Sequence, residues 1–253
     1  GDTLTLAVTV TEFPCGSMEA LYEAWFGALW SDPVPAAPCE LPLSEAYRLI
    51  QQKYDRENWY EPGGYYSVGQ RDGLYGYWQV GWVGGGICTA PLYQLGDAQT
   101  RTRCDRNLDF LFGPAQASGG LFYGIRDDKH FWGDDLQNHC DTSFHLLRKS
   151  ADALYYGALQ LLRRREAGEA LRAAWVGGLV RCADAFEAIW RRYGQLGQFV
   201  DVERNRILSG STASAAIAPA GLALLAALTD DARYLRLAEE IGAWLYAGFT
   251  QKG

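Results

Sequence analysis

Four acidic residues, a histidine and a tryptophan lie within the nine-residue stretch DDKHFWGDD, from Asp127 to Asp135. Asp134 and Asp135 are adjacent, so their charges repel, and burial would turn one of them into a usable proton donor. Trp132 has a flat apolar ring of the kind that stacks on a sugar. We therefore interpret Asp134 or Asp135 as a candidate catalytic acid. The alternative is a solvated acidic loop.

A second candidate carboxylate, Asp72, lies in the aromatic stretch GQRDGLYGYWQVGW. Cleavage of a glycosidic bond needs two carboxyl groups, roughly 5–5.5 Å apart for retention and 6.5–9.5 Å apart for inversion. Arg71 would hold the carboxylate of an acidic sugar or pair with Asp72. The candidate sugar-binding rings beside them are Tyr75, Trp78 and Trp82, and the alternative for the tryptophans is a place in the core. Further candidate acids are Glu61, Asp141, Asp201 and Glu203.

Metal ligands are not indicated by any spacing in the chain. The three histidines and Cys140 lack the usual arrangement of a zinc site. The segment that begins at Asp201 opens like a calcium loop, but Arg206 replaces its glycine and Thr212 its final acid. We predict no metal and no cofactor.

Composition excludes several classes of partner. The chain has 253 residues, 48% of them hydrophobic, which suits one large domain or one domain plus a fragment. A formal net charge of −7 argues against a nucleic-acid partner, and no apolar run is long enough to predict a membrane span. No signal peptide is visible. The six cysteines form no C-x-x-C pair and are expected to be mostly buried, reduced thiols, which favours a soluble cytoplasmic protein: Cys15, Cys39, Cys88, Cys104, Cys140 and Cys182.

The pattern of apolar residues divides the chain into three parts. Residues 1–16 contain an alternating stretch, Leu4–Val10, which predicts a β-strand element at the end of an upstream β-domain. Residues 17–42 are expected to form a helix and a proline-rich linker. Residues 43–253 begin with an amphipathic helix and then predict three helical hairpins: Val80–Leu95 with Ala98–Phe112, Thr142–Arg165 with Glu169–Arg192, and Ser211–Leu228 with Asp231–Phe249.

The two helices of a hairpin differ in character. The first is rich in small and apolar residues in the first and third hairpins, and the second carries one apolar stripe, so we expect an inner and an outer member. Similar glycine-aromatic segments, EPGGYYSVG, SGGLFYGI and LGQFVDV, each follow an outer-type helix and lead back toward the next inner helix. In the middle hairpin, Arg148, Asp152 and Tyr155 fall on neighbouring helical faces, which indicates either a polar cluster supporting a cleft or a plain ion pair.

Several of these stretches, among them GYWQVGWVGGG, LDFLFGPAQASGGLFYG and SGSTASAAIAPAGLALLAALTDDARYLRLAEEIGAWLY, resemble the (α/α)6-toroid, six-hairpin glycosidase superfamily. The resemblance covers residues 43 to 250. It implies an all-α toroid with a short N-terminal β-element, and a glycoside hydrolase-like protein that uses paired carboxylates, mostly with inversion. Six hairpins need more helices than this sequence predicts, so residues 43–253 are expected to form a partial toroid. The partners expected are a carbohydrate substrate and further toroid segments or an upstream β-domain.

Two other functions remain open on the same fold. A sugar epimerase or isomerase, as the resemblance implies, would place two of the histidines His130, His139 and His145 facing each other in the cleft. A non-catalytic carbohydrate-binding helical scaffold would disperse its acidic residues over the exterior. The positions of these side chains therefore distinguish the three functions.

Overall fold

The computed structural model describes residues 12–31, 41–69, 76–134 and 144–251, together with residues 3, 5, 7, 8 and 10. Helices dominate this described part, and eight short strands form three small sheets. The helices are α1 (Met18–Ser31), α2 (Leu43–Lys53), α3 (Thr89–Leu95), α4 (Ala98–Leu111), α5 (Leu147–Glu166), α6 (Ala173–Tyr193), α7 (Ala218–Thr229) and α8 (Ala232–Leu245), with single π-helical turns at Tyr54–Asn58 and Tyr246–Thr250.

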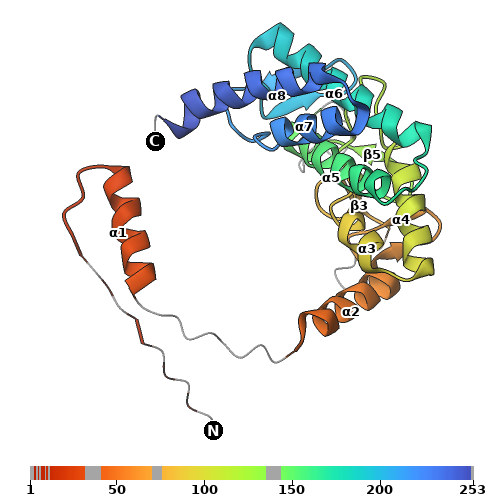
Figure 1. The fold of residues 1–253 in the computed structure, drawn as a ribbon, viewed down its shortest axis with the longest axis horizontal. Coiled ribbons are helices and arrows are strands. Elements are labelled where there is room, and N and C mark those ends of the chain that lie inside the picture. Colours follow the sequence, from red (N-terminus) through yellow and green to blue (C-terminus); the bar gives the residue numbers. More distant parts are fainter. Residues whose placement is uncertain are drawn as a thin grey trace.

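The helices pair as hairpins around an arc (Figure 1). The pairs are α3 with α4, α5 with α6, and α7 with α8, and α5 packs against both α3 and α7. The inner helix α7 is apolar on almost every side and buries Leu222 and Leu225, whereas the outer helix α8 buries one stripe that includes Leu237 and Ile241. The predicted all-α toroid architecture, with inner and outer helices, is confirmed.

All three inner helices begin later than the sequence predicts. The helix expected from Thr142 begins at Leu147, because His145 and Leu146 form strand β6. Residues 80–88, expected to be helical, form a glycine-rich turn before α3, because Gly81, Gly85 and Gly86 have φ values of +81°, +62° and +87°. Such values are not helical and are easily adopted only by glycine. In the same way α7 begins at Ala218 rather than at Ser211, whose φ is +60°.

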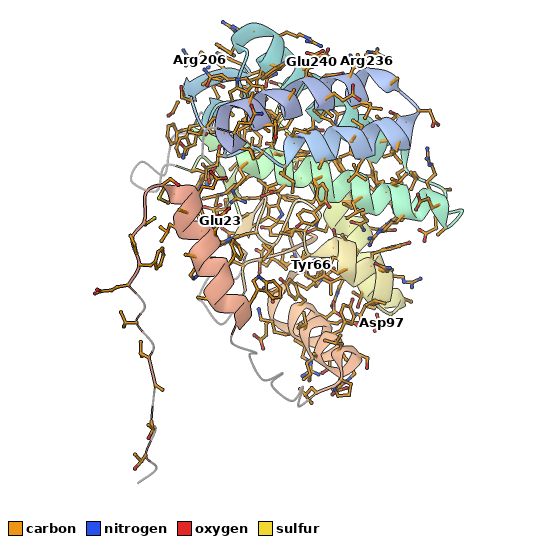
Figure 2. The ribbon with its side chains drawn as sticks, turned by 60° about the vertical axis from the view of Figure 1, so that its left-hand side comes forward. Glu23, Tyr66, Asp97, Arg206, Arg236 and Glu240 are labelled. Atoms are coloured by element: carbon orange, nitrogen blue, oxygen red, sulfur yellow. The ribbon has the colours of Figure 1, made fainter. Side chains whose placement is uncertain are left out.

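The strands lie at one end of the inner helices. They are β1 (Trp59–Tyr60), β2 (Tyr65–Tyr66), β3 (Trp78–Gln79), β4 (Ile125–Arg126), β5 (Phe131–Trp132), β6 (His145–Leu146), β7 (Phe199–Asp201) and β8 (Arg206–Ser209), and all pairings are antiparallel. The sheet β3–β4–β5 and the sheet β6–β7–β8 contribute the segments that enter α3, α5 and α7. Figure 2 shows Arg206 of β8 and Asp97, the N-cap of α4, on opposite sides of the helical body. We call the side with the sheets the strand end.

The N-terminal part differs from the prediction. The expected strand Leu4–Val10 lies partly outside the described residues, and those described there, such as Val8 and Val10, are exposed and have no strand structure. The helix expected within residues 17–42 is α1, which stands apart from the arc (Figure 1). Its Trp25 and Trp30 are exposed. Among the described residues, no helix has both the length and the apolar character needed to cross a membrane.

The described cysteines are free thiols. Cys88, Cys104 and Cys182 are buried, as expected, and burial raises the pKa of the Cys88 thiol to about 12. Cys15 is exposed. Cys39 and Cys140 lie outside the described residues.

Gly86→Ala tests the role of the glycine-rich turn. An alanine at this position would have to keep the φ of +87°, which is unfavourable for any residue with a side chain. Its Cβ would also lie 3.1 Å from the Gly157 nitrogen of α5. We expect the free energy of unfolding, measured by urea denaturation, to fall by about 1–3 kcal/mol. The matched control is Gly242→Ala in α8, where no atom lies within 4 Å of the new methyl; it should be neutral or stabilising. Equal effects of the two changes would contradict the packing described for the turn.

Candidate functional site

Asp134 follows the β4–β5 hairpin, and its side chain contacts the residues at the start of α5. Its side chain is 5% exposed and forms an ion pair with Lys149, whose side chain is 8% exposed. Its second oxygen, Oδ2, accepts a hydrogen bond from the Leu146 N–H at 2.8 Å, and its own N–H donates to the Phe144 carbonyl at 2.6 Å. Both carboxylate oxygens are thus occupied by protein donors. This geometry gives Asp134 a positioning role, and its neighbour Asp135 lies outside the described residues.

Asp152 is the described carboxylate with the properties of a proton donor. It lies on α5, one turn beyond Lys149, and 11% of its side chain is exposed. Burial raises its pKa above the ordinary value, although the Arg148 guanidinium, 2.5 Å from Oδ2, partly opposes this effect. Oδ1 has no hydrogen-bond partner among the described residues. An acid that keeps its proton at a higher pH and has one oxygen to spare suits general acid catalysis.

The backbone turn that carries an exposed aromatic residue packs on this acid. The turn before α3 packs directly on α5, so a Cβ added to Gly81 would lie 3.2 Å from Oδ2 of Asp152 and 3.1 Å from Cγ of Lys149. The next residue in the chain, Trp82, is 60% exposed. The residue that follows the contact with Asp152 in the chain is therefore a solvent-exposed tryptophan.

The other predicted aromatic residues have different environments. Trp78 is fully buried, with its ring 5.1 Å from that of Phe110, so it belongs to the core and has no free face for a sugar. Trp132 is half-buried, and its ring meets Tyr77 edge-on at 5.9 Å. The predicted Arg71, Asp72 and Tyr75 lie outside the described residues.

The remaining candidate acids make internal contacts. Glu203 accepts hydrogen bonds from the Ser118 and Tyr123 hydroxyl groups, which lower its pKa. Asp201 is fully buried; burial acts to raise its pKa, but hydrogen bonds from Arg204 and from the turn backbone lower it overall. Glu61 pairs with Arg106 on the surface at 2.5 Å. Asp141 is not among the described residues.

The turn after Asp201 is an internal cap. The Asp201 carboxylate accepts the N–H groups of Glu203 and Arg204 and pairs with the Arg204 guanidinium at 2.9 Å. Protein donors thus take the place that a cation would have in a calcium loop. In the part of the chain that the structure describes, no cluster of three or more His, Cys, Asp or Glu residues is arranged to hold a metal ion.

The two described histidines have opposite environments. His145 is buried in β6, and its Nδ1 accepts the Gly124 N–H at 2.9 Å. The His130 side chain is 74% exposed, and its Nδ1 lies 3.9 Å from Asp127. A buried acceptor and a solvated surface ring do not form a facing acid–base pair. His139 lies outside the described residues.

Comparison with known proteins identifies the architecture. No protein-family profile matches the chain, and no curated protein matches it. A search of solved structures finds an Asp-to-Asn variant of an unsaturated glucuronyl hydrolase, a six-hairpin glycosidase, with the oligosaccharide dGlcA-Glc-Rha-Glc. The TM-score is 0.56 at 16% identity, and the match covers 81% of this chain and 55% of that chain. The chain has the α/α-toroid fold. It spans about half the length of this glycosidase.

The Asp134–Lys149 ion pair can be tested by breaking it. Asp134→Asn leaves the buried ammonium group of Lys149 without its charge partner, so we expect the free energy of unfolding to fall by about 3–5 kcal/mol. In the double variant Asp134→Asn/Lys149→Met the loss should be smaller than the sum of the single losses. The control Glu45→Gln removes an exposed pair with Arg48 and should have little effect. Strictly additive effects at Asp134 and Lys149 would contradict the coupling.

The raised pKa of Asp152 predicts how stability depends on pH. The folded protein holds the proton of Asp152 more tightly than the unfolded chain, so this group contributes stability below the ordinary pKa of 3.8. That contribution is lost as the pH rises through the folded-state pKa. Urea denaturation of Asp152→Asn should therefore show a smaller decrease in stability with rising pH than the wild type over this window. Parallel curves for the two proteins would contradict the pKa direction.

Proposed function

We propose that the protein is glycoside hydrolase-like and cleaves a glycosidic bond of an oligosaccharide at the strand end of its inner helices. The observation that carries the proposal is the buried Asp152, with its raised pKa, directly beneath the turn that carries the exposed Trp82. The α/α-toroid fold shared with a six-hairpin glycosidase agrees with this proposal. Hydrolysis by two carboxyl groups and water needs no metal or cofactor.

In this proposal Asp152 donates a proton to the oxygen of the leaving sugar. A second carboxylate activates water on the opposite face of the ring, or attacks the ring itself, depending on the distance between the two groups. Asp72 and Asp135, which lie outside the described residues, remain our predictions for that second group. Asp134 acts through Lys149, which lies one helical turn from Asp152, and so positions α5 relative to the hairpin.

The sugar is held by aromatic side chains. Trp82 offers an exposed ring, and Trp132 lies at the edge of the β3–β4–β5 sheet with part of its ring accessible. Such rings bury the apolar face of a sugar and exclude water from the bond that is cleaved. Arg71 and Tyr75 remain predicted substrate contacts. Because the solved neighbour carries an oligosaccharide that includes dGlcA, oligosaccharides with an acidic sugar are the first substrates to test.

The placement of acids and histidines favours a hydrolase over the two alternatives. An epimerase requires two facing histidines, and the two that the structure describes do not face each other, because His130 is exposed and His145 is buried. His139 lies outside the described residues. A binding scaffold would carry its acids on the exterior, whereas Asp134 and Asp152 are buried beside the inner-helix surface. Oδ1 of Asp152 accepts no hydrogen bond from the described residues, so this carboxyl group is available to contact a substrate.

Asp152→Asn is the central activity test. Oligosaccharides with and without a terminal uronic acid are incubated with the full-length protein, and released sugars are measured by mass spectrometry. We expect Asp152→Asn to lower kcat by about 10²–10⁴-fold, because an amide cannot donate the proton, while its fold is retained. The matched control is Asp230→Asn, which replaces a carboxylate that is 89% exposed at the end of α7 and should leave the rate unchanged.

Asp72→Asn and Asp135→Asn complete this experiment. The variant that removes the second carboxylate should show a comparable loss of kcat, and azide or another small nucleophile should restore part of the rate if that carboxylate acts as a base or nucleophile. Full activity in Asp152→Asn would overturn the assignment of the acid. Unchanged activity in every one of these variants would overturn the proposed mechanism.

A further inference from the structure

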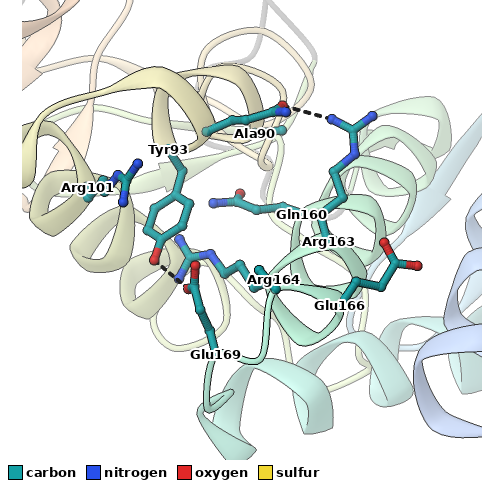
Figure 3. A pocket seen from close by; sticks show the side chains of 10 residues that line it. Ala90, Tyr93, Arg101, Gln160, Arg163, Arg164, Glu166 and Glu169 are labelled. Carbon is teal, nitrogen blue, oxygen red and sulfur yellow. Dashed lines mark hydrogen bonds between the residues drawn. The ribbon is translucent and has the colours of Figure 1, made fainter.

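A cleft lies at the opposite end of α5 from Asp152. It has a volume of about 520 Å³ and is enclosed by α3, α4 and the last turns of α5. Figure 3 shows its side chains, among them Tyr93, Arg101, Gln160, Arg163, Arg164 and Glu169. Arg164 lies twelve residues after Asp152, a distance of about 18 Å along the helix. The cleft is therefore separate from the site proposed for hydrolysis.

Arg164 forms part of the floor of this cleft and is only partly neutralised. Its side chain is 5% exposed, and Nη1 pairs with Asp105 at 2.7 Å. Asp105 also lies 3.7 Å from Arg172, so its negative charge is shared between two arginines. The Nε and Nη2 atoms of Arg164 are buried and have no hydrogen-bond partner among the described residues. The guanidinium carbon lies 3.3 Å from the centre of the Tyr93 ring, which holds it in place.

Gln160 adds a second buried donor, one turn before Arg164 on α5. The residue is 3% exposed, and its Oε1 accepts a hydrogen bond from the Thr89 hydroxyl at 3.0 Å. Its Nε2 has no partner in the described part of the chain. The unsatisfied polar atoms of the floor, from Arg164 and Gln160, are therefore all N–H donors. Buried donors of this kind call for an acceptor.

The rim of the cleft carries two arginines and two glutamates. Arg101 and Arg163 are exposed and hold the Gly96 carbonyl and the Gln94 side chain at 3.1 and 3.0 Å. Of the two glutamates in the lining, Glu169 accepts a hydrogen bond from the Tyr93 hydroxyl at 2.6 Å. With Arg164 of the floor included, the whole lining has three arginines and two glutamates, and one of these glutamates already accepts a hydrogen bond.

We propose that this cleft binds an oxyanion, the carboxylate or phosphate group of a small molecule. Both groups present several acceptor oxygens to the N–H groups of Arg164 and Gln160, and the planar guanidinium pairs with either in two-point geometry. Arg101 and Arg163 supply the compensating charge at the entrance. The site does not depend on the function proposed for the strand end.

Calorimetric titration of the full chain at low ionic strength tests this site, with inorganic phosphate and acetate as separate probes. We expect saturable binding of at least one probe at one site per chain. Arg101→Gln and Arg163→Gln change exposed residues and should each raise Kd by about fivefold, because each removes a charge near the anion. Glu166→Gln removes a lining negative charge and should lower Kd. The matched control Arg236→Gln, on α8, should leave Kd unchanged.

The two probes distinguish the sources of the oxyanion. Binding of phosphate alone assigns a phosphorylated ligand, binding of acetate alone assigns a carboxylate, and binding of both assigns the shared oxyanion chemistry. The proposal is overturned if neither probe shows saturable binding at millimolar concentration. It is also overturned if Arg236→Gln weakens binding as much as the changes in the cleft, because the effect would then be one of net charge alone.

Discussion

The buried ion pair between Asp134 and Lys149 joins the strand end of the molecule to the inner helix α5. Burying two charges costs free energy, which is recovered only when their geometry is good and the remaining lone pairs are satisfied. Here the Leu146 N–H satisfies the second oxygen of Asp134. Asp152 lies three residues after Lys149 on α5. The ion pair therefore also fixes the position of the proposed acid relative to the β4–β5 hairpin.

The glycine-rich turn before α3 also fixes the surroundings of Asp152, because it packs against α5. Because Gly81 and Gly86 have no side chain, the turn lies directly against α5, and Trp82, next to Gly81 in the chain, is exposed. Burial then keeps Asp152 protonated at higher pH than an ordinary aspartate. Packing, rather than any special property of the residue, therefore produces the acid that the proposed hydrolysis needs.

The helix α5 has different chemistry at its two ends. Near its start, Asp152 uses Oδ2 in the pair with Arg148, and Oδ1 accepts no hydrogen bond from the described residues. Near its end, the donors of Gln160 and Arg164 are buried and have no partner among those residues, which is uncommon in folded proteins. A protein that bound an acidic oligosaccharide at the strand end and a small oxyanion at the other end would use both sets of groups. The two proposals nonetheless rest on separate residues and fail separately.

The sequence predicted the architecture better than the site. Helical periodicity placed α4 and α8 within a few residues, because their apolar stripes are long, but the start of α3 was wrong because periodicity does not reveal a positive φ. Trp78 and Trp82 looked equivalent in sequence, yet the turn between them buries one and exposes the other.

The sequence also could not show the environments of the acidic residues. Asp134 was singled out by the density of acids around it, but its role depends on Lys149, fifteen residues away in the sequence. In the sequence Asp152 looked like part of a helical polar cluster, and its burial, which the sequence does not reveal, is what leads us to propose it as the proton donor.

A crystal structure of the full-length Asp152→Asn variant with an uncleaved oligosaccharide tests the central claim most directly. We expect a sugar at the strand end, with a glycosidic oxygen within hydrogen-bonding distance of residue 152, a ring stacked on Trp82, and a second carboxylate within about 10 Å of residue 152. A sugar bound elsewhere, or residue 152 closed off from the bound sugar, would contradict it.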